Sequence, residues 1–350
     1  MRVIQFDPVD SLFFREAKPF GIGEGGFLDS LFPPSAQTLS GAIRTAIGNT
    51  EKIDWQDSAK VKDLLGTAED PGPLSFKGPY LYKDGQRLYP VPKNLLYSAT
   101  ESAWTRLVPK NIYQSDLGEC HLPKAQNTLK KAKNIEQGWL DEAGLTAVLN
   151  GQLPQHYYRS EQLFKHEARV GIGRNNQTSS VEPGQLFFTR HIRLHNGISM
   201  AMALDGPVMI ESGTIRLGGE GRLAHISQSD VSLSVPKLTS DDCHSGQLLI
   251  TLLTHADLGG NTMPDWSQFN IPLECVSACI GKAIREGGWD YANSKPKPLR
   301  SLVPAGSCYF IKTDQPQALI KELQGMHLGH RTKFGYGEIV VGLWKENGEL

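Results

Sequence analysis

The residues whose chemistry most clearly suggests a function lie in the glycine-rich segment Gly325–Gly342, near the C-terminus. Glycines there alternate with cationic and aromatic side chains, which are His327, His330, Arg331, Lys333, Phe334 and Tyr336. Glycine lets a backbone pass close to a ligand, Arg and Lys neutralise phosphates, and aromatic rings stack on bases. The segment therefore fits a nucleic-acid clamp, although a tight turn that carries two cations fits it equally well.

A second candidate surface lies on a predicted helix that Pro33 and Pro34 introduce and for which Ser35 is a good N-cap. Its apolar stripe consists of Leu39, Ala42, Ile43, Ala46 and Ile47. Gly48 is expected to end the helix. The opposite face is small apart from Arg44, so a backbone could lie against it; this face carries Gln37, Ser40, Gly41 and Arg44. The helix N-terminus also offers N–H groups to a phosphate, and a solvated polar face is the alternative.

Two further cations, Arg15 and Lys18, lie in a loop rich in Gly, Pro and Phe that spans residues 11–34. The spacing Gly21-x-Gly23-x-x-Gly26 in this loop matches the dinucleotide-binding fingerprint letter for letter. That fingerprint needs a strand before it and a helix that opens within it, and here the glycines are followed by Pro33 and Pro34. We therefore reject a dinucleotide site.

The segment His166–Gly184 combines glycines and polar residues with Arg169 and Arg174. This composition suits an extended hairpin that projects from the body of the protein, and a surface loop is the alternative. Two more arginines flank a later glycine turn, Arg216 and Arg222.

Metal and cofactor chemistry find little support in the sequence. His191 and His195 are four residues apart on a predicted strand and so share a face, but no third ligand is evident nearby. Cys275 and Cys279 lack a second ligand pair, which is more typical of core packing. The sequence has no H-E-x-x-H, no paired C-x-x-C and no phosphate-binding G-x-x-x-x-G-K-[ST] motif. We expect neither a metal nor a cofactor, and a catalytic Asp in a loop is the metal-dependent alternative left open.

Length and composition restrict the class of protein. A chain of 350 residues suggests about two domains, and 39% hydrophobic with 21% charged residues indicates a globular protein. The odd and scattered set of five cysteines is expected for reduced thiols in the cytoplasm, and the N-terminus lacks an apolar signal region. A net charge of -1 argues against a free-standing nucleic-acid binder. It is compatible with a subunit that has one basic face and other faces committed to protein partners.

Strand and helix patterns recur in both halves of the chain. In the C-terminal half they predict a strand (247–255), a helical turn (272–279), strands (280–284 and 307–313), a helix (316–324) and a last strand (338–343). In the N-terminal half they predict a strand (3–6), the Ser35 helix and a hairpin (186–194 with 198–204) whose tip is His195-Asn196-Gly197. The order of elements in the C-terminal half is β-α-β-β-α-β, which is that of a ferredoxin-like unit. We therefore predict an α+β fold with two ferredoxin-like domains, residues 1–228 with an insertion at about 49–184, and residues 229–350 with the glycine-rich loop 325–337.

Several motifs together resemble a known family. They are L-F-F-R-E-A-K-P-F at Leu12–Phe20, L-F-P-P-S-A-Q-T-L-S-G-A-I-R-T-A at Leu31–Ala46, L-G-G-E-G-R at Leu217–Arg222, G-G-W-D and K-P-K-P-L-R-S-L-V-P-A-G-S-C-Y-F within Gly287–Phe310, and R-T-K-F-G-Y-G-E-I-V-V-G at Arg331–Gly342. In this order they resemble the RAMP proteins of type III-B CRISPR systems, most closely those that form subunit three of the Cmr module. The final loop is common to RAMP proteins, whereas the helix motif and the V-P-A-G-S segment are far more specific.

The resemblance implies two ferredoxin-like, RRM-like domains in a non-catalytic RNA-binding subunit that takes part in antiviral defence. Such a subunit caps the effector complex, holds the 5′ repeat-derived tag of the crRNA, and touches the large polymerase-like subunit and the first backbone subunit. It meets target RNA only near the boundary between tag and guide. A projecting hairpin separates tag from guide, and by placement this role falls on Arg169–Thr178.

By position, the resemblance carries RNA contact onto the glycine-rich loop and the first helix. The candidate RNA-binding residues are Arg331, Lys333, Tyr336, His330, Arg44, Gln37, Ser35, Arg15, Lys18, Arg169, Arg174, Arg216 and Arg222. Five of these cations are expected to converge on one face of the protein; they are Arg15, Lys18, Arg44, Arg331 and Lys333. The alternative function is a metal-independent endoribonuclease that processes precursor crRNA, as some RAMP relatives do with a histidine as general acid or base. Its candidate histidines are His156, His166, His327 and His330.

Overall fold

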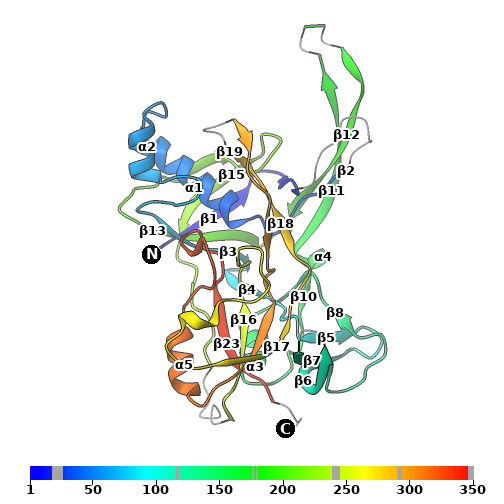
Figure 1. Ribbon diagram of the computed structural model, residues 1–350. Coiled ribbons are helices and arrows are strands. Elements are labelled where there is room, and N and C mark those ends of the chain that lie inside the picture. The colour runs from blue at the N-terminus through cyan, green and yellow to red at the C-terminus, as the bar shows by residue number, and fades with distance from the viewer. Residues whose placement is uncertain are drawn as a thin grey trace. The chain divides into compact units, whose positions relative to one another are not determined.

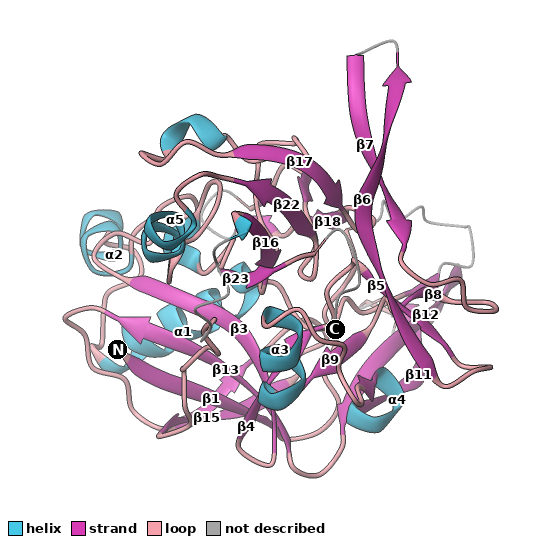
Figure 2. Ribbon diagram, turned by 90° about the horizontal axis from the view of Figure 1, so that it is seen from below, coloured by secondary structure: helices cyan, strands magenta, loops and turns pink. Residues whose placement is uncertain are grey.

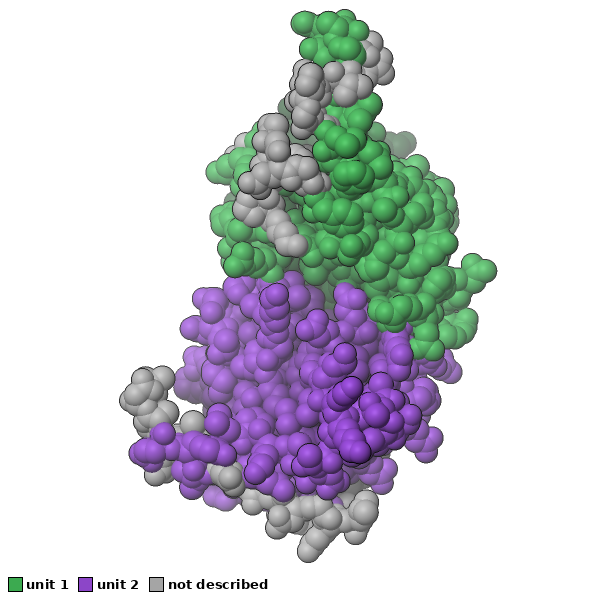
Figure 3. All heavy atoms as spheres, turned by 90° about the vertical axis from the view of Figure 1, so that its right-hand side faces the viewer, with its two compact units in different colours: residues 1–85, 160–231, 285–300 green, residues 86–159, 232–284, 301–350 purple. Residues whose placement is uncertain are grey.

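The computed structural model describes residues 1–17, 27–115, 118–175, 177–178, 180–238, 245–290 and 294–345. The chain forms two compact units (Figure 3). Unit 1 comprises Met1–Gly85, Ser160–Val231 and Arg285–Arg300, and unit 2 comprises Gln86–Arg159, Ser232–Ile284 and Ser301–Leu350. Strands outnumber helices among the described residues, so the expected α+β class is confirmed.

Unit 1 is organised around an antiparallel sheet. Its strands lie in the order β3 (Ser75–Lys83), β13 (Ile198–Asp205), β1 (Arg2–Pro8), β15 (Leu223–Ser229) and β14 (Gly213–Arg216). Each neighbouring pair is antiparallel. Apolar side chains of β1 and β13, such as Ile4, Phe6 and Met202, are almost completely buried, as expected for central strands.

Helix α1 (Ala36–Thr50) starts where the sequence predicts, because the backbone N–H of Thr38 donates to the Ser35 hydroxyl at 3.2 Å. The predicted stop at Gly48 is wrong: the helix continues to Thr50, and Glu51 is its C-cap. A Cβ at position 48 would lie 2.5 Å from the Trp55 ring. Gly48 therefore serves close packing of the chain that follows the helix, rather than termination. Helix α2 (Ser58–Leu65) comes next.

The predicted projecting hairpin is confirmed. Strands β11 (Phe164–Arg174) and β12 (Val181–Leu194) pair antiparallel and extend far from the sheet of unit 1 (Figure 1). They follow the short helix α4 (Ser160–Leu163), and β2 (Phe27–Leu28) adds to β12 as a parallel neighbour. Close packing continues into the hairpin, where the ring of Phe187 covers the bare backbone of Gly171.

The turn at His195-Asn196-Gly197 exists but does not make the predicted hairpin. Strand β12 pairs with β11 and β2, whereas β13 pairs with β1 and β3. The turn residues bond elsewhere: the N–H of His195 donates to Leu163, and the carbonyl of Gly197 accepts from Asp84. The local turn signal was correct, but long-range strand pairing decided which strands became neighbours.

Unit 2 contains a second antiparallel sheet. Its order is β17 (Glu274–Cys279), β22 (Cys308–Lys312), β16 (Gln247–Leu252) and β23 (Ile339–Leu343). Helix α5 (Pro316–Leu323) packs on it through Leu319 and Leu323, which are fully buried in the core of this unit. The strands of this sheet lie in the order second, third, first and fourth along the chain. Strands β3, β13, β1 and β15 of unit 1 lie in the same order, and β14 is added next to β15.

Two element predictions in this unit are wrong. Residues 272–279 were expected to form a helical turn, but Glu274–Cys279 is strand β17, because it pairs with β22. The strand expected at 280–284 is replaced by β18 (Ile284–Glu286), which pairs with β21 (Arg300–Leu302). The predicted order has a helix between its first two strands. Among the described residues between β16 and β17, the helical element is the short 3-10 turn η2 (Trp266–Gln268).

Residues 86–159 form regular structure that the sequence pattern did not reveal. Strands β4 (Gln86–Pro90), β9 (Gly138–Leu140) and β10 (Tyr158–Arg159) are neighbours, with helix α3 (Glu142–Leu149) nearby in the chain. A further sheet has the order β7 (Gly118–Ala125), β6 (Ala103–Ser115), β5 (Leu95–Ser98) and β8 (Lys133–Asn134). Strands β6 and β7 make a second long hairpin (Figure 2). In unit 1, β19 (Trp289–Asp290) pairs with β20 (Lys295–Pro296).

Helix α3 and strand β23 approach so closely that only glycine fits at position 342. A Cβ there would lie 2.8 Å from the Cα of Leu149. We expect Gly342→Ala to lower the free energy of unfolding by about 1–3 kcal/mol, because the backbone of α3 must move away. Gly213→Ala is the matched control, since a Cβ on β14 meets no atom within 4 Å. Urea denaturation of both variants checks this, and an unfolding midpoint for Gly342→Ala equal to that of Gly213→Ala would contradict it.

Candidate nucleic-acid interface

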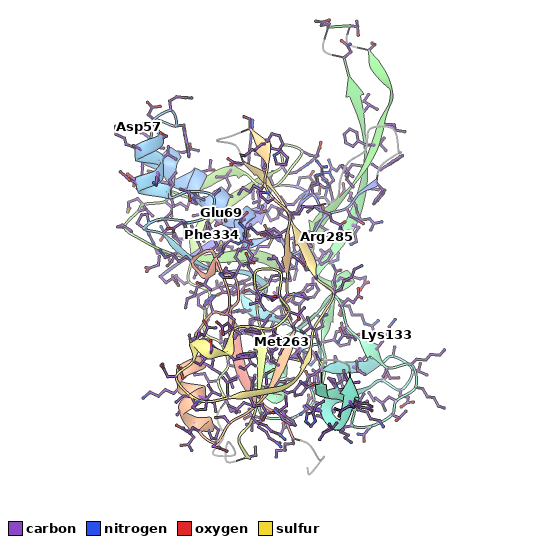
Figure 4. All side chains as sticks on the ribbon, in the orientation of Figure 1. Asp57, Glu69, Lys133, Met263, Arg285 and Phe334 are labelled. Atoms are coloured by element: carbon purple, nitrogen blue, oxygen red, sulfur yellow. The ribbon has the colours of Figure 1, made fainter. Side chains whose placement is uncertain are left out.

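The glycine-rich loop lies in unit 2, between α5 and β23, and contains the 3-10 turn η3 (Thr332–Phe334); Phe334 is labelled in Figure 4. The left-handed backbone at Gly337, with φ of 76°, requires glycine, and a Cβ there would lie 2.0 Å from the carbonyl oxygen of Leu328. The N–H of Leu328 donates to the carbonyl of Gly337 at 2.8 Å, which closes the loop. The glycine serves the loop's own compactness.

A short segment after β16 holds the loop in place. The N–H of Gly337 donates to the carbonyl of His255 at 2.8 Å, and the N–H of His330 donates to the carbonyl of Asp257 at 2.7 Å. The hydroxyl of Thr254 donates to the carbonyl of Gly335 at 2.8 Å. Residues 254–257 therefore bind the loop at three points along its length, and we call them the anchor segment.

Arg331 and Tyr336 are buried within the loop. The Nε of Arg331 donates to Oδ2 of Asp257 at 2.7 Å, and the two side chains are only 5% and 3% exposed. The guanidinium lies 4.3 Å from the centre of the Tyr336 ring, which is itself 1% exposed. The cationic and aromatic groups that suggested RNA contact are thus engaged with each other and with Asp257, and they shape the loop. On the outside of the loop, His330 and Lys333 are exposed.

The V-P-A-G-S segment supports the same anchor. Ala256 and Val303 exchange two backbone hydrogen bonds of 2.9 Å, and the N–H of Ala305 donates to Nδ1 of His255 at 2.9 Å. Burial lowers the pKa of His255 to about 4, and the charge of Lys93 acts in the same direction. Two motifs that are far apart in the sequence therefore meet on one half-buried, neutral histidine.

A buried ion pair fixes the exit of the loop. Glu338 accepts from Arg87 at 2.7 Å, and the two side chains are 8% and 4% exposed. The N–H of Glu338 donates to the hydroxyl of Thr254 at 2.9 Å, and the Arg87 guanidinium lies over the ring of Tyr89. Because removing one partner of a buried pair strands the other charge, this pair holds the start of β23 firmly.

The outer face of α1 carries a small cationic cluster. The ammonium of Lys297 donates to Oε1 of Gln37 at 3.3 Å, and Nε of Arg44 has no hydrogen-bond partner among the described residues. Burial lowers the pKa of Arg44. Burial is also the main cause that lowers the pKa of Lys297; the charge of Glu69 opposes this effect, and the charge of Arg44 adds to it. Both cations are therefore partly desolvated. A Cβ at Gly41 meets no atom within 4 Å, so this face is open.

Lys297 is a candidate that the sequence reasoning missed. It lies in the K-P-K-P-L-R-S stretch, which carried the family resemblance but no residue role. The neighbouring Arg300 pairs with Glu69 at 2.6 Å, and Glu69 is labelled in Figure 4. The cation-rich composition of the stretch was the available signal, but its return to α1 is a long-range contact that no local pattern indicates.

An ionic network ties the projecting hairpin to the start of the chain. Asp10 accepts from Arg193 at 2.6 Å, from Arg169 at 2.9 Å and from Arg222 at 3.3 Å. Hydrogen bonds from Arg193 and Arg169 lower the pKa of Asp10 to about 2. Glu167 also binds Arg169 and Arg193. Two predicted RNA contacts, Arg169 and Arg222, are therefore engaged at the base of the hairpin.

The remaining predicted residues are placed as follows. The hydroxyl of Ser35 caps α1, and the side chains of Arg15 and Arg216 are exposed. Lys18 lies outside the described residues, and of Arg174 only the backbone, at the end of β11, is described. Of the thirteen predicted residues, those of the glycine-rich loop belong to unit 2 and the others to unit 1; the unit 2 residues are His330, Arg331, Lys333 and Tyr336.

The histidines proposed for catalysis have varied surroundings. His156 pairs with Asp141 at 2.8 Å, and Nδ1 of His327 donates to the carbonyl of Tyr336 at 2.8 Å within the loop. His166 is exposed on β11, and burial against its neighbours lowers its pKa. Among the described residues, no group of three or more His, Cys, Asp or Glu is arranged to hold a metal ion.

The α+β fold and the glycine-rich loop agree with the RAMP-like class that the sequence predicts. A family model described as CRISPR-associated protein (Cas_Cmr3) matches residues 4–344. The chain therefore belongs to the Cas_Cmr3 family, and the resemblance to subunit three of the type III-B Cmr module is confirmed. No curated protein matches the chain.

Two solved structures with a similar fold contain chains of the Type III-B Cmr-beta complex. A chain of the Type III-B Cmr-beta complex bound to cognate target RNA matches with a TM-score of 0.54 and 16% identity, over 97% of this chain and 96% of that one. A chain of the same complex bound to cognate target RNA and AMPPnP matches with a TM-score of 0.51 and 14% identity, over 92% and 88%. At this level of identity the likeness shows the fold. Among the described residues, no helix is long and apolar enough to cross a membrane.

Two glycines of the loop provide a matched test of its packing. Both Gly325 and Gly337 have φ of 76°, but a Cβ at Gly325 meets no atom within 4 Å, whereas one at Gly337 meets the Leu328 carbonyl. We expect Gly325→Ala to cost only the left-handed strain, about 1–2 kcal/mol, and Gly337→Ala to cost clearly more or to prevent folding. Thermal unfolding of both variants measures the difference. Equal melting temperatures would show that the loop is not packed as described.

His255 predicts a pH dependence of stability. Its pKa is about 4 in the folded chain, below the ordinary 6.5, so the unfolded chain binds the extra proton first as pH falls. The free energy of unfolding should therefore be unaffected by His255 above about pH 6.5 and should decrease by up to about 3 kcal/mol as pH falls to 4. In His255→Gln, whose amide oxygen can accept the Ala305 N–H, this contribution to the slope should disappear.

Urea denaturation between pH 4 and 7 measures that slope. The exposed His225 provides the control, and His225→Gln should keep the slope of the unmodified chain. If His255→Gln and His225→Gln behave alike, His255 is not the neutral, low-pKa group described.

Proposed function

We propose that the chain is a non-catalytic RNA-binding subunit of a type III-B CRISPR effector complex, which caps the complex and binds the 5′ repeat-derived tag of the crRNA. The observation that carries this proposal is the family match across residues 4–344. Two features of the chain support it independently, an anchored loop with exposed cations and an open helix face with a cationic cluster.

We also infer that each unit is built on a ferredoxin-like domain. The strand order second, third, first, fourth with antiparallel neighbours is the order of a β-α-β-β-α-β sheet, and both units have it. Unit 1 keeps the first helix of that pattern as α1, and unit 2 keeps the second helix as α5. The predicted domains, residues 1–228 and 229–350, remain part of this proposal. Strand β3 belongs to the sheet of unit 1, although it lies within the stretch 49–184 that was predicted as an insertion.

The loop suits RNA binding because its backbone is already ordered. Hydrogen bonds to the anchor segment and the buried Arg331–Asp257 pair fix its shape without a ligand. A preorganised loop loses little conformational entropy on binding. Lys333 and His330 are exposed on it and would contact phosphates, whereas Arg331 and Tyr336 would position them from beneath.

The face of α1 suits a phosphate group. Burial lowers the pKa of both Arg44 and Lys297, so a bound anion would stabilise their charged forms. Gln37 already orients Lys297, and Gly41 leaves room for a sugar–phosphate backbone to approach. Phosphate contacts of this kind fix the register of a nucleic acid, as the binding of a constant tag requires.

The β11–β12 hairpin suits the boundary between tag and guide. The ionic network around Asp10 holds its base, and one of its faces is apolar and open. Val170 is 64% exposed, Ile172 51% and Leu186 50%, and Ile172 lies directly opposite Leu186. Such a face could lie against an unstacked base and keep two stretches of RNA apart.

The partners proposed are the large polymerase-like subunit, the first backbone subunit and, near the boundary between tag and guide, target RNA. A net charge of -1 agrees with a cytoplasmic subunit that covers part of its surface with other proteins. We assign no chemistry to the chain. The endoribonuclease alternative is tested by incubating the chain with repeat RNA in EDTA, where specific cleavage that disappears in His330→Ala would establish it.

Gly41 tests whether RNA lies on α1. Gly41→Gln adds a side chain in open space and favours the helix by about 0.5–1 kcal/mol, so the free chain should be at least as stable as before. The longer side chain should nevertheless obstruct the RNA and weaken crRNA binding several-fold. Gly41→Ala, which adds one methyl group, is the matched control and should bind almost normally.

Filter binding with tagged crRNA and with the same RNA lacking its tag measures both effects. Removal of the tag should cost the unmodified chain more affinity than it costs Gly41→Gln. Lys297→Gln should lower the slope of log K against log salt by about 0.7, the value for one phosphate on a single strand. Equal affinity of all variants for tagged RNA would contradict the assignment of α1, and equal affinity of the unmodified chain for both RNAs would contradict tag binding.

A further inference from the structure

The β7-β6-β5-β8 sheet of unit 2 carries a concentration of positive charge that the proposed tag site does not use. Residues 120–134 include four lysines and no acidic residue, in a chain whose net charge is -1. These lysines are all exposed, and Lys133 is labelled in Figure 4; they are Lys124, Lys130, Lys131 and Lys133. The charge therefore faces solvent and is available to a partner.

Aromatic side chains stand next to these lysines on the same sheet. Tyr97 pairs with Lys133 on one side and with Trp104 on the other, so the three side chains form one cross-strand row on one face. Tyr157 joins this row, with its ring centre 5.2 Å from that of Tyr97 and 5.2 Å from that of Trp104. The guanidinium of Arg159 lies 5.6 Å from the Tyr157 ring centre.

The three rings are half-buried rather than enclosed. Trp104 and Tyr157 pack on a small core cluster that includes Leu95, Leu140 and Val148, which explains why they are aromatic and why they are ordered. Each of the three residues nevertheless keeps part of its surface in solvent. Packing on this core cluster explains the buried part of these side chains. It does not explain what the exposed part, next to the lysines, contacts.

From this juxtaposition, we propose that the row Lys133–Tyr97–Trp104, with Tyr157 and the neighbouring Lys130 and Lys131, is a second binding surface for single-stranded RNA. It is built from residues outside both the glycine-rich loop and α1, and so goes beyond tag binding. Exposed ammonium groups contact the phosphates, and the aromatic rings stack on unpaired bases. Because every base has a stacking face, this surface tolerates any sequence.

The chemistry favours RNA over a protein partner. Lysine is depleted in protein–protein interfaces, because its long side chain loses much entropy when it is immobilised there. A phosphate backbone instead accepts exposed lysines as mobile point charges and releases counterions on binding. A single strand is favoured over a duplex, because paired bases cannot stack on side chains.

A salt titration with the full chain tests the proposal. The probe is a fluorescein-labelled oligouridine of about 15 nucleotides, which has no tag, and binding is followed by fluorescence anisotropy. In the variant Lys130→Gln/Lys131→Gln/Lys133→Gln, affinity at low salt should fall at least tenfold. The slope of log K against log salt should decrease by about 2, or about 0.7 for each of three phosphates.

The matched control removes three other exposed lysines of unit 2, in the variant Lys237→Gln/Lys282→Gln/Lys321→Gln. It has the same change in net charge and should keep nearly the original slope. Equal slopes for the two triple variants would overturn the proposal, since binding would then follow net charge alone. Normal oligouridine binding by the first variant, together with loss of a protein partner, would also overturn it in favour of a protein-docking surface.

Photocrosslinking locates the contact independently of charge. An oligouridine that contains 4-thiouridine should crosslink to peptides that include Tyr97, Trp104 or Tyr157. Crosslinks confined to the glycine-rich loop and α1 would contradict a second surface. The result is separate from tag binding, because a chain that failed to discriminate tagged crRNA could still crosslink here, and the reverse also holds.

Discussion

The attachment of the glycine-rich loop to the anchor segment, residues 254–257, is the constraint on which the organisation of unit 2 depends. The backbone of this segment accepts hydrogen bonds from the loop on one side and exchanges them with Val303 on the other. The carboxylate of Asp257 then neutralises the buried guanidinium of Arg331. Loss of Asp257 would leave that charge without its carboxylate, which typically costs about 3–5 kcal/mol, so the loop and its support behave as one structure.

This arrangement gives two separate motifs one structural role. In the V-P-A-G-S segment, the N–H of Ala305 donates to Nδ1 of His255. In the G-Y-G turn, the N–H of Gly337 donates to the carbonyl of His255. The two motifs act together, because each one forms a hydrogen bond with His255, which belongs to neither motif. The requirement that buried polar groups be paired thus connects segments that are about 30 to 80 residues apart in the chain.

Positive charge in this chain is local, which its net charge of -1 conceals. Arginines at the base of the hairpin are paired with Asp10 and Glu167, whereas Lys297 binds Gln37 of α1 and the lysines of 120–134 face solvent. Several arginines predicted to bind RNA, which are Arg169, Arg222 and Arg331, form ion pairs within the fold instead.

Local signals in the sequence determined what local physics controls: the N-cap of α1, the long β11–β12 hairpin, the glycine-rich turns and the family to which these motifs belong. Tertiary structure alone decided the partners of those elements. It paired β12 with β11 rather than β13, made Glu274–Cys279 a strand, buried Arg331 on Asp257 and brought Lys297 to Gln37. The reason is that capping and turns depend on residues a few positions apart, whereas burial and ion pairing depend on groups that only the folded chain brings together.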